Sequence, residues 1–431
     1  MSLGVTALIL VGGLFLLLAL GAEIFVAIGT MGAIALVVFM GQGLDQFAYT
    51  SWSELASFSL TATPLFIFMG AMFASSGVVR TLFRGSDKLL SFLPGGMAAS
   101  SIIASAVFGA ISGSSIASVA AFGNSILPEM VRLGYKPKLS VGAICMGGTL
   151  SVLIPPSVIL IIYGAYQQVS VPRLFAGGLV PGLILALCYL VTIFILVRRD
   201  PTLVPVRSPM TLSDKLSGFK DVLPAASIIG IILGFIFGGV MTPTEAAAVG
   251  AILSMGLAAM YKTLNRKTLK EAALQAVKVT AMIMPLIVVV KVFGYAFKFL
   301  GATDVLSDLL LGLPFGKLGI MAVIFLIYII LGTFMEGISI MLLSLAFVAP
   351  VIANLGFSFI WFGVIIVIVN ELGLVTPPFG LNLFALRGVA PQYSLFFIAG
   401  SCLPFYPAVL ITLGLCTVFP QLITWLPELL F

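Results

Sequence analysis

The sequence predicts an all-α polytopic membrane protein made of two inverted-topology repeats. Of the 431 residues, 61% are hydrophobic and only 8% are charged. A soluble domain of this length could not be so apolar, and long uncharged runs are typical of membrane spans. Two Pro-Pro pairs interrupt such runs, and similar motifs flank both pairs in the same order. The composition therefore predicts the membrane class, and the repeated motifs predict a duplicated fold.

The duplication appears as a constant interval between matching motifs. Pro377 follows Pro155 by 222 residues (377 − 155), and Leu355-Gly356-Phe357 follows Leu133-Gly134-Tyr135 by the same interval. Further matches occur in the same order at nearly the same interval, namely Pro64 with Pro285, Leu93-Pro94 with Leu313-Pro314, and Pro128 with Pro350. Several matches in one order indicate an internal duplication.

The stretch Glu371–Asn382 is the main candidate site. Its two prolines cannot continue a helix, because proline removes a backbone donor and clashes with the preceding turn. In lipid, a broken helix is tolerated only where it lines a cavity or is buried in protein. Asn370, Glu371, Thr376 and Asn382 flank this break. A structural kink is the alternative explanation of one Pro-Pro pair, but two matching pairs favour a shared function.

Each half also contains an apolar segment with a polar interruption, at Gly109–Ser118 in the first half and Thr333–Ser339 in the second. We interpret each as a re-entrant helical hairpin with a polar tip. Close helix packing through small residues is the alternative explanation of Ser112–Ser115. A charged, amphipathic segment precedes each hairpin, and such segments are typical of helices that lie along the membrane interface.

These features divide the chain into consecutive parts. In order, we predict scaffold spans at 1–76, a first interfacial arm at 77–96, a re-entrant hairpin at 97–133, a broken helix at 137–166, a scaffold span at 171–197, a cytoplasmic connector at 198–220, scaffold spans at 221–299, a second arm at 300–316, a second hairpin at 317–355, a second broken helix at 358–388 and a C-terminal span at 393–428. This layout has ten full spans and two hairpins, a polar loop at 42–54, and hinges at 94–96 and 314–316.

The basic residues predict the orientation. Most of the 21 Lys and Arg residues fall on one side of this layout, which the positive-inside rule assigns to the cytoplasm. The base of the first hairpin is basic, so we expect it to enter from the cytoplasm. The base of the second is not basic, so we expect it to enter from outside. The two halves would then have opposite topology, with both termini outside.

Composition also disfavours several functions. The chain has no histidine, and its four cysteines lack metal-ligand spacing, so zinc and His-based triad chemistry are excluded. The net charge of +6 comes from residues between spans and does not require nucleic acid as a partner. We therefore expect no enzyme activity and no bound organic cofactor.

Inverted repeats with broken helices are typical of secondary transporters. Half-helix N-termini attract anions, while freed carbonyls and hydroxyls can surround a hard cation such as sodium. Glu336 and Glu371 lie inside apolar runs, where a carboxylate indicates a functional site, although helix capping is an alternative. For Lys291 we expect snorkelling or contact with a partner subunit.

Four motifs together resemble the large membrane subunit (M subunit) of the TRAP (tripartite ATP-independent periplasmic) transporters, in the ion transporter superfamily. They are Ile111–Ser115, Ile154–Ser157, Leu331–Glu336 and Leu374–Phe384. The resemblance covers nearly the whole chain and implies an elevator transporter of the bacterial inner membrane. It implies sodium-coupled uptake of an organic acid anion, such as a C4-dicarboxylate or sialic acid, delivered by a periplasmic substrate-binding protein. It also implies a small four-span membrane subunit, which we expect as a separate polypeptide.

On this basis we predict two sodium sites with the substrate between them. The predicted sodium ligands are Ser112, Ser114, Ser115, Gly148 and Thr149 in the first half, and Thr333, Ser339, Gly373 and Thr376 in the second. The predicted substrate residues are Ser157, Asn370, Pro377, Gly380 and Asn382. Two alternatives remain: a stand-alone sodium/dicarboxylate-type carrier, and an anion channel of similar repeat architecture.

Overall fold

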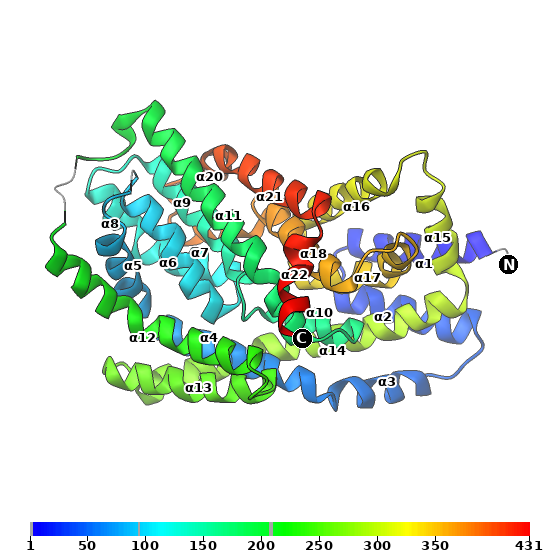
Figure 1. Ribbon diagram of the computed structural model, residues 1–431. Helices are drawn as coiled ribbons and strands as arrows, with labels where there is room; N and C mark the ends of the chain where they lie inside the picture. Colours follow the sequence, from blue (N-terminus) through cyan, green and yellow to red (C-terminus); the bar gives the residue numbers. More distant parts are fainter. Residues whose placement is uncertain (1–2, 94, 207–209) are drawn as a thin grey trace.

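The protein is helical throughout the part that the structure describes. The computed structural model describes residues 3–93, 95–206 and 210–431, and no strand occurs in these ranges. Figure 1 shows the hairpin helices α6 and α7 on one side of the molecule and α16 and α17 on the other, with α10 and α18 between them. The predicted hinge residue Pro94 and part of the predicted connector, 207–209, lie outside the described residues.

The first half contains eleven α-helices and three short segments of π- or 3-10 helix. They are α1 (Leu3–Ala19), α2 (Ile24–Ile34) with a π-helical continuation (Ala35–Phe39), α3 (Asp45–Leu55), a 3-10 turn (Phe58–Thr61) leading into α4 (Ala62–Ser75), α5 (Val78–Leu89), α6 (Met97–Ser112), α7 (Ser115–Ser125), α8 (Leu127–Arg132), α9 (Pro137–Thr149) with a 3-10 turn (Leu150–Val152), α10 (Val158–Gln167) and α11 (Val171–Arg199).

The second half follows a short 3-10 turn (Pro201–Leu203). Its helices are α12 (Leu212–Phe237), α13 (Pro243–Met260), α14 (Arg266–Phe299), α15 (Ala302–Leu311), α16 (Lys317–Gly332), α17 (Gly337–Asn354), α18 (Phe359–Leu374), α19 (Leu381–Val389), α20 (Leu395–Cys402), a 3-10 turn (Leu403–Phe405), α21 (Tyr406–Val418) and α22 (Gln421–Leu430).

Matching helices of the two halves begin at a nearly constant interval. The starts of α6, α7, α9 and α10 at 97, 115, 137 and 158 correspond to those of α16, α17, α18 and α19 at 317, 337, 359 and 381. Both Pro-Pro bonds, Pro155-Pro156 and Pro377-Pro378, are cis. The helix boundaries thus follow the interval seen in the sequence.

Seven of the described helices are long and apolar enough to cross a membrane. The shorter apolar helices include α1 and one helix beside each Pro-Pro break, α10 and α18, because a break divides a membrane-length segment into parts that are individually too short. The chain is therefore a multi-pass membrane protein, while the count of ten spans stays a prediction.

Two segments differ from the expected layout. The predicted polar loop at 42–54 is wrong, because α3 occupies most of it. Phe47 on this helix packs against the apolar core, and the helix lies against α14. Most residues of this helix are polar, so its composition did not indicate that Phe47 contacts the core. The predicted connector is also shorter than expected, because Thr211 and Asp214 form a capping box that starts α12 at Leu212.

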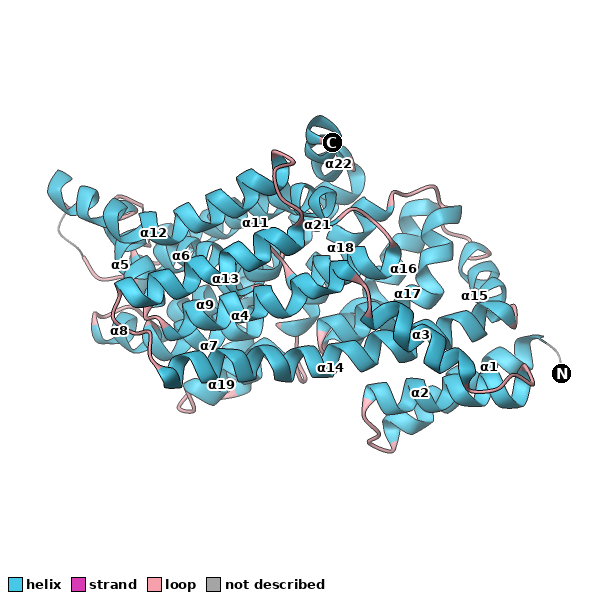
Figure 2. Ribbon diagram, turned by 90° about the horizontal axis from the view of Figure 1, so that it is seen from below, coloured by secondary structure: helices cyan, strands magenta, loops and turns pink. Residues whose placement is uncertain are grey.

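Helix α14 joins the two halves. It has 34 residues and contacts α2, α3 and α4 of the first half as well as α17 of the second. Figure 2 shows it running along one face of the molecule, beside α4 and α3. Its buried face is apolar and includes Ile283, Ile287, Val290 and Phe293. Such packing stabilises helix association in lipid, where neighbouring acyl chains weaken the hydrophobic driving force.

We expect Gly142→Ala to destabilise the protein by roughly 1–3 kcal/mol, the usual cost of overpacking. A Cβ at Gly142 in α9 would lie 2.3 Å from the backbone oxygen of Ser401 in α20. Thermal unfolding in detergent would measure the effect. Gly414→Ala in α21 is the matched control, because a Cβ there has no neighbour within 4 Å. Equal melting temperatures for the two variants would contradict this packing of α9 on α20.

Candidate functional site

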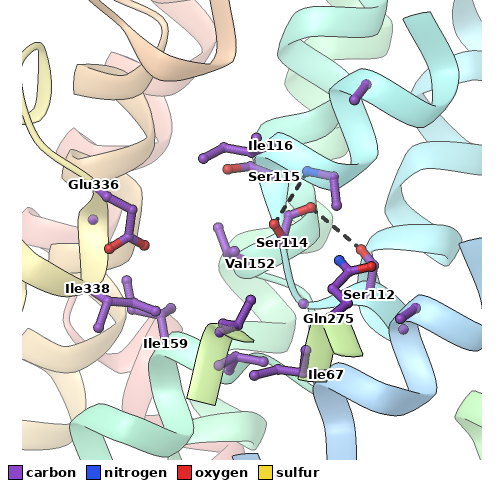
Figure 3. Close-up of a pocket in the computed structure, with 18 of the residues that line it drawn as sticks. Ile67, Ser112, Ser114, Ser115, Ile116, Val152, Ile159, Gln275, Glu336 and Ile338 are labelled. Atoms are coloured by element: carbon purple, nitrogen blue, oxygen red, sulfur yellow. Dashed lines mark hydrogen bonds between the residues drawn. The ribbon is translucent and has the colours of Figure 1, made fainter. Parts of the chain in front are cut away.

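A cavity of about 370 Å³ lies where the two halves meet. Both hairpin tips and both broken helices line it, together with α4 and α14. Figure 3 shows Glu336 and the pair Ser114 and Ser115 on opposite sides of this cavity. The polar residues that line it are Ser112, Ser114, Ser115, Gln275, Glu336 and Glu371.

Three helices begin at the cavity wall. The first residues of α7, α10 and α17 all line it, namely Ser115-Ile116-Ala117, Val158-Ile159 and Gly337-Ile338. Each helix has a side-chain cap: Ser114 accepts from Ala117 N at 3.3 Å, Ser157 from Leu160 N at 3.5 Å, and Glu336 from Ser339 N at 3.3 Å. The first amides of a helix have no intrahelical acceptor and carry the positive end of its dipole. Three such ends directed at one cavity favour an anion.

A buried polar cluster around Glu371 connects the two halves. Ser115 Oγ, at the first hairpin tip, donates to Glu371 Oε1 at 3.1 Å. Asn382 Nδ2, at the start of α19, donates to Glu371 Oε2 at 3.4 Å. Glu371 is 5% exposed and Asn382 is fully buried. Both glutamate oxygens therefore bind donors that are supplied by different repeats.

Each hairpin tip also packs on the broken helix of its own half, at equivalent positions. In the second half, Asn370 Nδ2 donates to the carbonyl of Gly337 at 3.2 Å. In the first half, a Cβ at Gly148 would lie 3.2 Å from the carbonyl oxygen of Ser115. The two pairs, 115 with 148 and 337 with 370, match at the repeat interval. Asn370 Oδ1 and Asn382 Oδ1 are buried and have no hydrogen-bond partner.

The structure brings together four of the five predicted first-half sodium ligands. Ser112, Ser114 and Ser115 line the cavity, and Gly148 lies beside Ser115. Thr149 does not line it. Its hydroxyl donates to the carbonyl of Met146 at 2.7 Å and lies 2.8 Å from the hydroxyl of Tyr189 on α11. The interruption of the hairpin is shorter than expected, because only Gly113 and Ser114 separate α6 from α7.

The predicted second-half ligands Thr333, Ser339, Gly373 and Thr376 lie near the second hairpin tip but do not line the cavity. Thr333 Oγ1 donates to Ile330 O at 2.8 Å, and Thr376 Oγ1 donates to Leu372 O at 2.6 Å. Gly373 packs on Gly332, where an added Cβ would come within 2.7 Å of the Gly332 Cα. Ser339 lies next to Glu336, with its hydroxyl 3.5 Å from the carboxylate. None of these four side chains lines the cavity.

The predicted substrate residues separate into two groups. Asn382 belongs to the Glu371 cluster, Asn370 contacts Gly337 at the second hairpin tip, and Ser157 caps the α10 end that opens on the cavity. Pro377 is exposed, and Gly380 is buried with its Cα facing the carbonyl of Leu374. Neither of the last two residues lines the cavity.

The predicted ligand sets lack three polar residues of this region, although the sequence already indicated Glu336 and Glu371 as functional candidates. Gln275 on α14 lines the cavity, and Glu336 and Glu371 had no place in either ligand set. A carboxylate within an apolar run was the available signal for Glu336 and Glu371, whereas Gln275 lies between the charged residues Glu271 and Lys278 and carried no such signal. Lys291 Nζ donates to Tyr166 O at 2.9 Å and lies 3.6 Å from the Glu54 carboxylate. Among the described residues, no group of three His, Cys, Asp or Glu side chains could hold a metal ion.

We expect Ser115→Ala and Glu371→Gln to be energetically coupled. In a double-mutant cycle the coupling free energy should be about 0.5–3 kcal/mol, as for other residues in direct contact. Reversible unfolding in mixed SDS micelles would measure it. Ser254→Ala provides the matched control, because Ser254 is fully buried in α13 and bonds locally to Ala251 O. Additive effects in both cycles would show that the Ser115–Glu371 bond has no energetic weight.

Several proteins with related sequences are named as transporter permeases. The chain is 31% identical to a C4-dicarboxylate TRAP transporter large permease from Vibrio cholerae, over 96% of each chain. It is 29% identical to a sialic acid TRAP transporter large permease from the same organism, over 91% of this chain and 92% of that one. It is also 32% identical to an isethionate TRAP transporter permease, DctMQ, from Oleidesulfovibrio alaskensis, over 89% of this chain and 60% of that one.

The fold is likewise similar to that of a solved transporter. The structure of MtrF from Neisseria gonorrhoeae, described as an antimetabolite efflux pump, aligns with a TM-score of 0.56 at 12% identity, over 87% of this chain and 83% of that one. The predicted helical membrane fold is confirmed, and the permease relatives confirm that the chain is not an enzyme. Residues 11–422 match the family model for the DctM component of the tripartite ATP-independent periplasmic transporters. The chain therefore belongs to this family.

Proposed function

We propose that this protein takes up an organic acid anion across the bacterial inner membrane, driven by sodium, through an elevator motion. The observation that supports this most directly is the convergence of three helix N-termini from both halves on one cavity, beside the buried Glu371 cluster. Such sites at broken helices are the recurring binding sites of secondary transporters.

The cavity suits a small carboxylate or sulfonate. The relatives are named for C4-dicarboxylates, sialic acid and isethionate, all of which are anions. Backbone amides at the starts of α7, α10 and α17 would bind the charged group, and Gln275 would bind a second polar group from the α14 side. Helix N-termini bind the charged group of a ligand and do not distinguish its carbon skeleton. The proposal therefore names the class of organic acids and no single member of it.

The Glu371 cluster suits a sodium ion. The carboxylate of Glu371 and the unpaired amide oxygens of Asn370 and Asn382 supply oxygen ligands at one break. Hard cations prefer such ligands. A buried acceptor without a partner is rare and costs free energy, which a bound cation would recover. Ser115 would connect this ion to the first hairpin tip, where Ser112 and Ser114 carry further hydroxyls.

The transporter would work with two partners. The relative from Oleidesulfovibrio is named DctMQ, and this chain covers 60% of it, which leaves room for a fused second membrane subunit. The names of the Vibrio relatives call them large permeases, which fits a small four-span partner here. A periplasmic substrate-binding protein would deliver the anion. Copurification without any partner would favour the stand-alone carrier instead.

The walls of the cavity suggest how the protein moves. Helices α4 and α14 form one wall, and the hairpins and broken helices form the other. The contact is close, since a Cβ at Gly70 of α4 would lie 2.7 Å from the Cα of Ser112. We propose that residues 94–166 and 317–388 slide as one body against the remaining spans. The Lys291 contacts, between α14 and the end of α10, would have to break during this motion.

Uptake into proteoliposomes should require a sodium gradient. Asn382→Leu should raise the half-saturating sodium concentration roughly tenfold, because one oxygen ligand of about 1.5 kcal/mol is lost. Asn354→Leu is the matched control, since Asn354 is exposed at the end of α17. Flux that runs downhill and ignores sodium would support the anion channel, and equal uptake on a proton gradient without sodium would refute the proposed coupling.

Two engineered disulfides distinguish sliding from rocking. A Cβ at Gly294 of α14 would lie 3.4 Å from the Cβ of Ala346 in α17, and one at Gly29 of α2 would lie 3.7 Å from the Cβ of Val289 in α14. Both spacings suit a disulfide. Oxidation of Gly294→Cys/Ala346→Cys should stop uptake until the disulfide is reduced, because it ties the moving body to α14. Oxidised Gly29→Cys/Val289→Cys should transport normally.

A rocking motion of one half against the other gives the opposite result. Gly294 and Ala346 both belong to the second half, so their disulfide would leave rocking intact. Gly29 and Val289 belong to different halves, so theirs would stop it. The native cysteines should be replaced before the measurement.

A further inference from the structure

A second cavity, of about 600 Å³, lies away from the proposed transport site. It opens between the amphipathic helix α5 and the helices α7 and α8 at the base of the first hairpin. We call it the arm cavity. Its charged lining residues are Arg80, Arg84, Asp87, Glu129 and Arg132.

Two guanidinium groups of the arm cavity lack an ion-pair partner among the described residues. Arg80 and Arg84 are exposed and lie one turn apart on α5, and neither forms an ion pair with another described residue. Arg132 is already paired, because its guanidinium donates to both oxygens of Glu129 at 2.6 and 3.1 Å. These hydrogen bonds hold the pKa of Glu129 below its ordinary value, so the pair stays ionised. Asp87 is buried and has interactions of its own.

The arm cavity also has an apolar floor. Phe83, Met97 and Ile126 line it and are buried. Leu133, directly after α8, also lines the cavity and is exposed, and Val131 on α8 is exposed as well. A basic rim above an apolar floor fits an amphiphile with an anionic head better than a free inorganic anion, which would have no use for the apolar side.

We propose that the arm cavity binds the phosphate headgroup of an anionic phospholipid, with Arg80 and Arg84 on the phosphate and the acyl chains along α8. The basic side of the chain, where the cavity lies, is the side that the positive-inside rule assigns to the cytoplasm. Arginine suits the phosphate because its planar donors bind two oxygens at once.

The position of this site gives the lipid a structural role. Helix α5 is attached to α12 by Lys88, whose Nζ lies 3.1 Å from the Asp221 carboxylate, and by close approach of Gly85 to Gly218. The other wall, α7 and α8, belongs to the hairpin. The lipid would therefore bridge the two elements, and this role alone rests on the proposed sliding motion.

The test is direct binding of short-chain phosphatidylglycerol to the purified full-length protein in neutral detergent. Arg80→Gln/Arg84→Gln should bind about thirtyfold more weakly, from about 1 kcal/mol for each charge removed. Lys267→Gln/Lys270→Gln is the matched control, because it removes two exposed charges at the start of α14. Its affinity should be unchanged. Arg80→Lys/Arg84→Lys, which keeps the charge, should fall between the two.

Three outcomes would overturn the proposal. Equal affinity of the parent protein and Arg80→Gln/Arg84→Gln would exclude the cavity as the site, provided that both unfold at the same temperature without lipid. An equal loss of affinity in the Lys267→Gln/Lys270→Gln control would show that lipid binding depends on net charge and not on the arm cavity. Inorganic phosphate that binds as tightly as phosphatidylglycerol would assign the cavity to a free anion.

Discussion

The satisfaction of backbone polar groups inside the membrane is the constraint on which this structure depends. Each Pro-Pro pair interrupts a helix within an apolar segment, where the lost backbone hydrogen bonds have to be replaced by protein groups or by a polar cavity. Side chains at the breaks supply some of those groups. Asn370 donates to the carbonyl of Gly337, and Ser157 accepts from the start of α10. Broken helices and hairpins therefore have to pack together, and the cavity is where their ends meet.

Much of the architecture could be predicted from three features that are visible in the sequence. These are apolar runs long enough to cross a membrane, prolines that interrupt them, and a constant interval between matching motifs. The helix starts at 115, 137, 337 and 359 follow that interval closely. The wrong loop at 42–54 has the opposite cause, since α3 is stabilised by a contact of Phe47 with the core that no local pattern reveals. The sequence also does not reveal the direction in which each polar side chain of the site points. Thr149 bonds to Tyr189, which is distant in sequence, and so does not line the cavity.

The two halves have diverged at matching positions of the site. Ser114 and Glu336 are equivalent caps, and Thr149 and Glu371 occupy equivalent places in the broken helices. Both acidic residues belong to the second half. Glu371 nevertheless binds Ser115 of the first half, so a duplicated frame carries an asymmetric charge arrangement. A fold with two similar halves thus has one acidic side and one hydroxyl side.

The charges on the cavity wall affect how tightly an anion can bind in the cavity. The described lining residues include two carboxylates but no Lys or Arg, so an anion entering alone meets repulsion that only helix dipoles oppose. A cation beside Glu371 would remove that repulsion. By thermodynamic reciprocity, each ion then raises the affinity for the other by the same factor. Coupling of this kind needs no separate gate that responds to both ions. The protein with only one ion bound is less stable than the protein with both ions bound.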